Sequence, residues 1–171
     1  MGMDVYGKNP KNEKGTYFRR NVWGWRPLWE YCEHNYEDLV SDVSGHYNDG
    51  DGLDELGSIE LSKRIVADIE SGKAQDYINQ RNTYLAELPR DTCDLCQGSG
   101  IRTDKIGVEN KMADRELEPE MAILTGRTKG WCNACNGEGK KDSWDTNYFL
   151  DLDDLKEFAE FLADSGGFEI C

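Results

Sequence analysis

The sequence contains two copies of one pattern, Cys-x-x-Cys-x-Gly-x-Gly, and this repeat constrains the fold more than any other feature. The cysteines of the two copies are Cys93, Cys96, Cys132 and Cys135. A Cys-x-x-Cys turn holds two thiolates at the spacing of metal ligands, and two such turns complete a tetrahedron. The glycines after each second cysteine allow positive φ angles, so that backbone amides can approach the sulfurs. The pattern therefore predicts one shared four-cysteine metal site.

Zinc is the metal that we expect at this site, as one structural ion. Iron is an alternative, because a four-thiolate site offers both metals the same tetrahedral geometry. Two disulfides are a further alternative, although they would leave the matching glycine turns unexplained. A site with four protein ligands has no open position for water, which is typical of structural zinc and not of catalytic zinc.

The charge of the chain is strongly acidic and unevenly distributed. The 171 residues carry a formal net charge of −14. Residues 31–62 contain nine acidic residues and no lysine or arginine, and residues 142–171 contain nine acidic residues and one lysine. Direct binding to nucleic acid is therefore disfavoured, because affinity for phosphates depends on neutralisation by cations. The charge favours a protein partner with a basic surface, or serves solubility alone.

The sequence shows no targeting or membrane segment. No apolar run approaches the length of a membrane span, and no charged-then-apolar leader opens the chain. Four cysteines that act as metal ligands also fit a reducing compartment. We therefore expect a cytoplasmic protein.

The pattern of apolar residues, caps and turns predicts an α+β fold with three to four helices, a small sheet and an inserted zinc module. Residues 1–90 plus 141–171 are expected to form the α+β body, and residues 91–140 the module. The predicted elements are strands at 1–7 and 168–171, helices at 58–70, 73–88 and 151–163, and a short helix at 119–125. The sheet is expected to pair the strands near the two ends of the chain.

Three details of the helices are specific enough to be checked. Pro27 suits the first turn of a helix, and Ser58 suits the N-cap of another. The helices at 58–70 and 73–88 are expected to pack as an antiparallel pair.

The two repeats resemble the cysteine-rich zinc domain of DnaJ (Hsp40) chaperones, in which such repeats pair two per zinc ion and help to hold unfolded clients. The resemblance covers residues 93–139 and implies that the four repeat cysteines are the zinc ligands. Two repeats imply one zinc ion. The sequence contains no His-Pro-Asp tripeptide, through which such chaperones act on an Hsp70 partner.

The rest of the chain resembles a group of small bacterial and phage proteins to which no activity is assigned. The shared stretches are Met-Gly-Met-Asp-Val-Tyr-Gly, Asn-Val-Trp followed by Trp-Arg-Pro-Leu, His-Tyr-Asn-Asp-Gly and Gly-Gly-Phe-Glu-Ile. This resemblance spans nearly the whole length and implies a single integrated fold.

Two further segments contain candidate binding residues. Residues 17–29 combine aromatic side chains, which can stack on bases, with arginines, which can contact phosphates. The same tryptophans could instead form the core. The polar loop that begins at His46 fails the calcium-binding spacing, so a turn held by its own Asn and Asp side chains is expected. The candidate ligand- or partner-binding residues are Arg19, Trp23, Arg26, His46 and Asp49.

The sequence favours an acidic, zinc-stabilised protein that acts by protein–protein interaction. No nucleophile elbow, phosphate-binding lysine loop or His-Glu-x-x-His motif occurs, and we lean against enzymatic activity. One alternative is a phage-type inhibitor of a host nucleic-acid enzyme or defence system that mimics DNA with its acidic surface. Another is a nucleotide or small-ligand binder, or an enzyme, that uses the Arg/Trp stretch and His46. The acidic residues expected to face the partner are Asp151, Asp153, Asp154 and Glu157.

Overall fold

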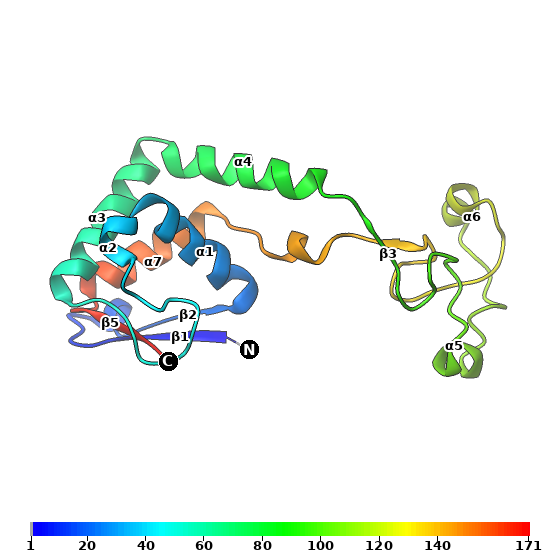
Figure 1. Cartoon of the computed structure of the whole chain (residues 1–171), viewed down its shortest axis with the longest axis horizontal. Coiled ribbons are helices and arrows are strands. Elements are labelled where there is room, and N and C mark those ends of the chain that lie inside the picture. Colours follow the sequence, from blue (N-terminus) through cyan, green and yellow to red (C-terminus); the bar gives the residue numbers. More distant parts are fainter. Residues whose placement is uncertain (1) are drawn as a thin grey trace. The chain divides into compact units, whose positions relative to one another are not determined.

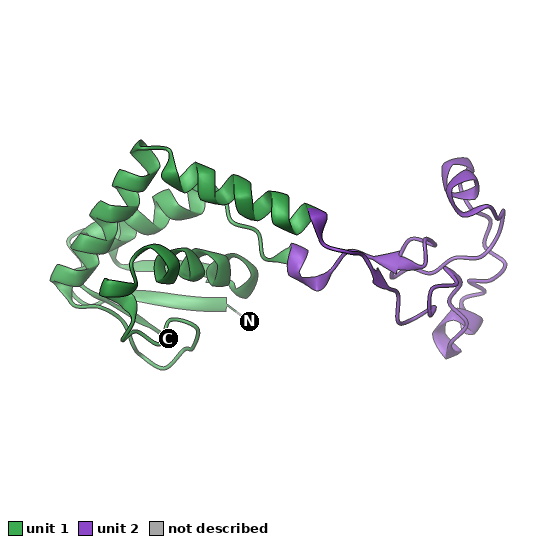
Figure 2. Ribbon diagram, turned by 45° about the horizontal axis from the view of Figure 1, so that its top comes forward, with its two compact units in different colours: residues 1–86, 147–171 green, residues 87–146 purple. Residues whose placement is uncertain are grey.

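A computed structural model describes residues 2–171 and shows an α+β protein. The chain forms two compact units (Figure 2). Unit 1 comprises the residues up to Ala86 together with Asn147–Cys171, and unit 2 comprises Glu87–Thr146. None of the helices among the described residues is long and apolar enough to cross a membrane.

Unit 1 contains an antiparallel sheet that joins segments near the two ends of the chain (Figure 1). Its strands are β1 (Gly2–Gly7), β2 (Tyr17–Asn21) and β5 (Phe168–Ile170), in the order β2-β1-β5. Val5 of β1 pairs with Phe18 on one side and with Ile170 on the other. Because side chains alternate along a strand, Met3 and Val5 share the buried face. The predicted pairing of the terminal segments is confirmed.

One helix holds the core of unit 1 together. The helices of this unit are α1 (Val22–Asn35), α2 (Glu37–Val40), α3 (Glu55–Glu70), α4 (Lys73–Glu87) and α7 (Leu152–Asp164), with a short 3-10 helix, η1 (Glu13–Gly15). Helix α7 packs against α3 and also against β1 and β2. Its buried side chains include Leu155, Phe158, Phe161 and Leu162. The predicted closing helix and the strand after it are confirmed.

The tryptophan-rich stretch supplies part of this core. Trp25 and Trp29 are fully buried, and their rings stack with centroids 5.7 Å apart. The indole Nε1 of Trp25 donates a hydrogen bond to the carbonyl oxygen of Gly45 at 2.7 Å. The core interpretation is therefore correct for these two tryptophans.

Two predicted helix starts are wrong. Helix α1 begins at Val22, because the Asn21 side chain accepts a hydrogen bond from the amide of Gly24 at 3.0 Å and caps the helix. Pro27 consequently lies inside the helix, where it removes one backbone hydrogen bond. Helix α3 begins after Asp54, whose carboxylate caps it.

The residue predicted as the cap of α3 has a different role. Ser58 is buried within the helix, and its hydroxyl donates to the carbonyl oxygen of Leu162 at 2.9 Å. It thereby links α3 to α7. The predicted antiparallel pair of α3 and α4 does not form, because α3 packs against α7 while α4 leaves at an angle after Gly72 (Figure 1).

Unit 2 contains only short regular elements. They are β3 (Asp91–Thr92), α5 (Lys105–Glu109), α6 (Pro119–Thr125), β4 (Lys140–Lys141) and the 3-10 helix η2 (Trp144–Asn147). Strands β3 and β4 pair in an antiparallel ribbon. The predicted helix at 119–125 is confirmed. Seven α-helices among the described residues exceed the three to four expected, since the one- and two-turn helices α2 and α5 have too few residues for a clear periodic pattern.

We predict that Gly45→Ala destabilises unit 1. A Cβ at this position would lie 1.9 Å from a ring atom of Trp29, so the buried indole would have to move. Overpacking of this kind costs about 1–3 kcal/mol. Gly24→Ala is the matched control, because its Cβ would meet no atom closer than 3.8 Å and alanine favours a helix. Urea unfolding followed by tryptophan fluorescence measures both, and equal stabilities would contradict the prediction.

Candidate metal centre

The four cysteines of the two repeats meet in unit 2. Their sulfurs all lie within 4.8 Å of one another. The Sγ atoms of Cys93 and Cys132 are 3.9 Å apart, and those of Cys96 and Cys135 are 3.7 Å apart. Metal–sulfur bonds of about 2.3 Å in a tetrahedron require sulfurs about 3.8 Å apart. A disulfide would need about 2.05 Å, so all four are free thiols that fit one metal ion.

The two turns have the same backbone conformation. The residue after each second cysteine has a positive φ, 51° at Gln97 and 50° at Asn136, and the next glycine continues it. The amide of Gly100 then donates to Cys96 Sγ at 3.2 Å. In the second turn the amide of Gly139 donates to Cys135 Sγ, also at 3.2 Å. The predicted approach of backbone amides to the sulfurs is confirmed in both copies.

The last glycine of each repeat also allows the two turns to touch. A Cβ at Gly100 would lie 2.2 Å from the carbonyl oxygen of Gly137 in the other turn. A Cβ at Gly139 would lie 2.2 Å from the carbonyl oxygen of Gly98. Only glycine fits at these two positions. The contact is reciprocal and brings the two cysteine pairs to metal-binding distance.

Arg127 ties the two turns together from outside. It follows α6, and its Nη1 and Nη2 atoms donate to the carbonyl oxygens of Ser99 and Gly100, both at 3.0 Å. Nη2 also donates to the carbonyl oxygen of Gly137 in the second turn. One guanidinium group therefore bridges the carbonyls of both repeats.

Arg102 forms a second bridge and places a buried positive charge near the sulfurs. Its guanidinium binds both carboxylate oxygens of Asp104, at 2.7 and 2.9 Å, and the side-chain oxygen of Asn133 at 2.9 Å. Asn133 lies between the cysteines of the second turn. Hydrogen bonding to Asp104, together with the nearby sulfurs of Cys132 and Cys93, raises the pKa of Arg102. This cation favours the thiolate forms on which metal binding depends.

The thiols of the second turn resist ionisation without a metal. Burial raises the pKa of Cys132, and it raises that of Cys135 to about 12. At Cys93 burial acts in the same direction, but hydrogen bonds from the backbone amides of Cys96 and Leu95 outweigh it and lower the pKa. A bound cation would displace the remaining protons.

Comparison of the chain with protein-family models, with curated proteins and with solved structures finds no match. The resemblance to the DnaJ zinc domain therefore depends on the two turns themselves. The capacity of these turns to bind a metal is inferred from the geometry of the site.

Two of the candidate ligand-binding residues lie around one tyrosine. The rings of Trp23 and Tyr148 have centroids 4.9 Å apart, and Arg26 lies over the same tyrosine ring at 5.7 Å. The carbonyl oxygen of Tyr148 accepts hydrogen bonds from Arg81 on α4. Sequence reasoning missed Tyr148 and Arg81, because both are distant in the chain from the Arg/Trp stretch.

The other candidate ligand-binding residues are each held by a neighbour. Arg19 pairs with Asp4 at 3.4 Å, and His46 Nε2 lies 3.1 Å from the carboxylate of Glu33. Asp49 accepts from the amide of Asp51 at 3.4 Å, as expected for a turn held by its own side chains. None of the hollows described in residues 2–171 is lined by these three residues together with Trp23 and Arg26.

The acidic surface expected on α7 is largely compensated. Arg20 of β2 binds Asp154 and Glu157, each at 2.5 Å. Asp153 pairs with Lys156 at 2.9 Å, and Asp151 caps the helix by accepting from the amide of Asp154. Three of the four carboxylates thus form ion pairs within the chain.

A buried polar network in unit 1 was also missed. The Oδ2 atom of Asp68 accepts hydrogen bonds from the hydroxyls of Tyr31 and Tyr36, both at 2.8 Å, and from Lys73 at 2.9 Å. Burial opposes ionisation of Asp68, but these donors outweigh it and lower its pKa. Burial raises the pKa of both tyrosines. The network joins α1, α3 and α4, and its groups satisfy one another.

We predict that Cys93→Ser or Cys132→Ser abolishes stoichiometric metal binding. Without the metal, residues 87–146 lose their only buried cluster, so their amide exchange should accelerate while that of unit 1 stays unchanged. Elemental analysis and hydrogen exchange measure the two effects. Cys171→Ser is the control, because Cys171 is exposed and outside the cluster. An equally protected unit 2 in the metal-free variant would contradict the prediction.

We predict that Arg127→Ala accelerates loss of the metal to a chelator. Partners outside the ligand shell typically contribute about 10–100-fold to metal affinity, and this variant frees three carbonyls from both turns. Stopped-flow release into a coloured chelator measures the rate. Lys129→Ala is the control, because it removes a similar charge at an exposed lysine whose side chain forms no hydrogen bond or ion pair with residues 2–171. Equal release rates would show that Arg127 does not hold the site.

Proposed function

We propose that this is a zinc-stabilised protein-binding protein and that unit 2 carries a partner surface. A closed tetrahedral set of four thiolates is typical of structural zinc, and six free cysteines fit the reducing cytoplasm. One observation carries the proposal. The four cysteines are the only hydrophobic side chains buried in residues 87–146, so the metal takes the place of a core.

Several aliphatic side chains of unit 2 face solvent instead. Ile106 and Val108 are 50% and 68% exposed, and Ile123 and Leu124 on α6 are 85% and 67% exposed. Helix α6 has no buried residue at all. A metal-held module does not need these side chains for its own folding, so their exposure supports a role in binding a partner.

The acidic balance of the chain supports a partner with a basic surface at unit 1. Because α7 is compensated, we place this contact on residues 31–62. Glu37 and Asp42 form no ion pair with any of residues 2–171. Glu37 also lines a hollow of about 250 Å³ together with Glu33, Val40 and Ser41. A lysine or arginine of the partner would find two carboxylates there.

We expect Ile123→Ser to weaken binding of the partner that co-purifies with the protein from its own cells. A buried aliphatic anchor commonly contributes about 2 kcal/mol or more, which corresponds to roughly thirtyfold in affinity. Calorimetry with the purified pair measures the change. Tyr84→Ser in unit 1 is the control, because Tyr84 is also exposed, at 62%, and lies outside both unit 2 and residues 31–62. Equal losses, or no loss, would contradict the proposed surface.

The same pair tests the electrostatic part of the proposal. Contacts between exposed charges weaken as salt rises. An affinity that is equal at low and at high salt would contradict the basic partner surface. It would not contradict the apolar surface of unit 2.

A further inference from the structure

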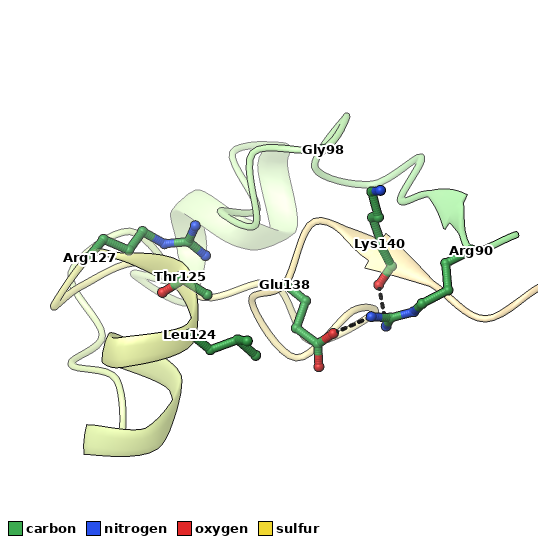
Figure 3. A pocket seen from close by; sticks show the side chains of 7 residues that line it. All are labelled: Arg90, Gly98, Leu124, Thr125, Arg127, Glu138 and Lys140. Carbon is green, nitrogen blue, oxygen red and sulfur yellow. Dashed lines mark hydrogen bonds and ion pairs between the residues drawn. The ribbon is translucent and has the colours of Figure 1, made fainter.

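Unit 2 contains a hollow of about 410 Å³ beside α6 (Figure 3). Its lining residues are Arg90, Gly98, Leu124, Thr125, Arg127, Glu138 and Lys140. Figure 3 shows Arg127 and Leu124 on one side, and Arg90, Glu138 and Lys140 on the other. Three cations therefore share this hollow with one carboxylate.

Two of these cations have no compensating carboxylate. Arg90 is neutralised, because it binds Glu138 at 2.6 Å and Asp142 at 2.9 Å. Arg127 donates only to backbone carbonyl oxygens. The ammonium group of Lys140 forms no hydrogen bond or ion pair with residues 2–171, and Figure 3 shows it unconnected. In a chain of net charge −14, this is a local positive site.

One lining residue, Gly98, also has a backbone amide that is unpaired within residues 2–171. In the second turn the amide of Gly137 donates to the carbonyl oxygen of Cys132 at 3.1 Å. Its counterpart in the first turn, the amide of Gly98, has no hydrogen-bond partner within the described chain. Turns with positive φ commonly present such amides to anions. The two repeats thus differ at the glycine that lines the hollow.

The rest of the lining decides between classes of anion. Leu124 is 67% exposed at the edge, and Ile123 beside it is 85% exposed. The lining contains no aromatic side chain on which a nucleobase could stack. A hollow lined by cations and an aliphatic side chain is complementary to a ligand that carries a carboxylate beside an aliphatic group.

We propose that this hollow binds an acidic peptide segment of a protein partner. Carboxylates of the segment would meet Lys140 and Arg127, and an aliphatic side chain would lie against Leu124. This inference rests on the proposed function, because it names the chemistry that unit 2 recognises. Unit 1 would then address a basic surface and unit 2 an acidic segment.

The test uses the metal-loaded full chain and a fluorescein-labelled peptide of alternating glutamate and leucine. Fluorescence anisotropy should show binding that Lys140→Glu weakens about fivefold to tenfold, since it replaces an attraction by a repulsion. Glu138→Gln should strengthen binding severalfold, because it removes the one carboxylate of the lining and leaves Arg90 paired with Asp142 alone. Lys105→Glu is the control, since it makes the same charge change at a side chain that is 88% exposed and lies outside the lining. Metal content is measured for every variant.

Three results would overturn the inference. Equal weakening by Lys140→Glu and Lys105→Glu would reduce the effect to long-range charge. Equal binding of a lysine–leucine peptide would exclude recognition of carboxylates. Inorganic phosphate that displaces the peptide at equal concentration would indicate a simple anion site.

The outcome can be separated from that of the proposed function. If Ile123→Ser abolishes binding of the co-purifying partner while the acidic peptide does not bind, the proposed function stands and this inference fails. If the peptide binds as predicted and Ile123→Ser leaves the affinity for the partner unchanged, the acidic-segment site stands and the aliphatic partner surface fails.

Discussion

The contact among four cysteine sulfurs is the interaction on which residues 87–146 depend. No other hydrophobic side chain in this unit is buried, and its regular elements are too short to be stable alone. Several contacts in the unit bring the sulfurs together. Reciprocal glycine contacts align the two turns, backbone amides reach the sulfurs, and two guanidinium groups tie the repeats. A unit built in this way can leave its aliphatic side chains in solvent, which a unit folded by apolar burial cannot.

Local patterns predicted the parts of this protein that depend on local chemistry. The spacing of cysteines and glycines was sufficient to predict that the four cysteines cluster and how each turn is bent, because each turn is specified within eight residues. The start of α3 could not be decided in this way, since Asp54 and Ser58 are both good caps. The tertiary structure selects Asp54, because the hydroxyl of Ser58 meets the carbonyl of Leu162 across the core. Arg102 and Arg127 were missed for a similar reason: their partners depend on how the insert folds back.

Charge counted along the sequence overstated the acidity of one surface. Residues 142–171 are acidic as a segment, yet Arg20 approaches them from β2 and binds two carboxylates of α7. A count by segment cannot include a counter-ion that tertiary structure supplies. In unit 2 a count along the sequence understates a local positive charge. Its cations and acids are mixed along the chain, but Lys140 and Arg127 come together in one hollow without a carboxylate of their own.

The four-cysteine site and the hollow share parts of the same two turns. Gly98 belongs to the first turn, Glu138 to the second, and Arg127 is the residue that bridges them. A loss of the metal would therefore scatter the lining of the hollow, because no apolar core would keep these residues in place. The acidic residues of unit 1 do not share this dependence, since α1 and α7 are held by buried aromatic packing. In the proposed function, loss of the metal would therefore abolish recognition by unit 2 and leave recognition by unit 1 intact, although the ion itself would contact no partner.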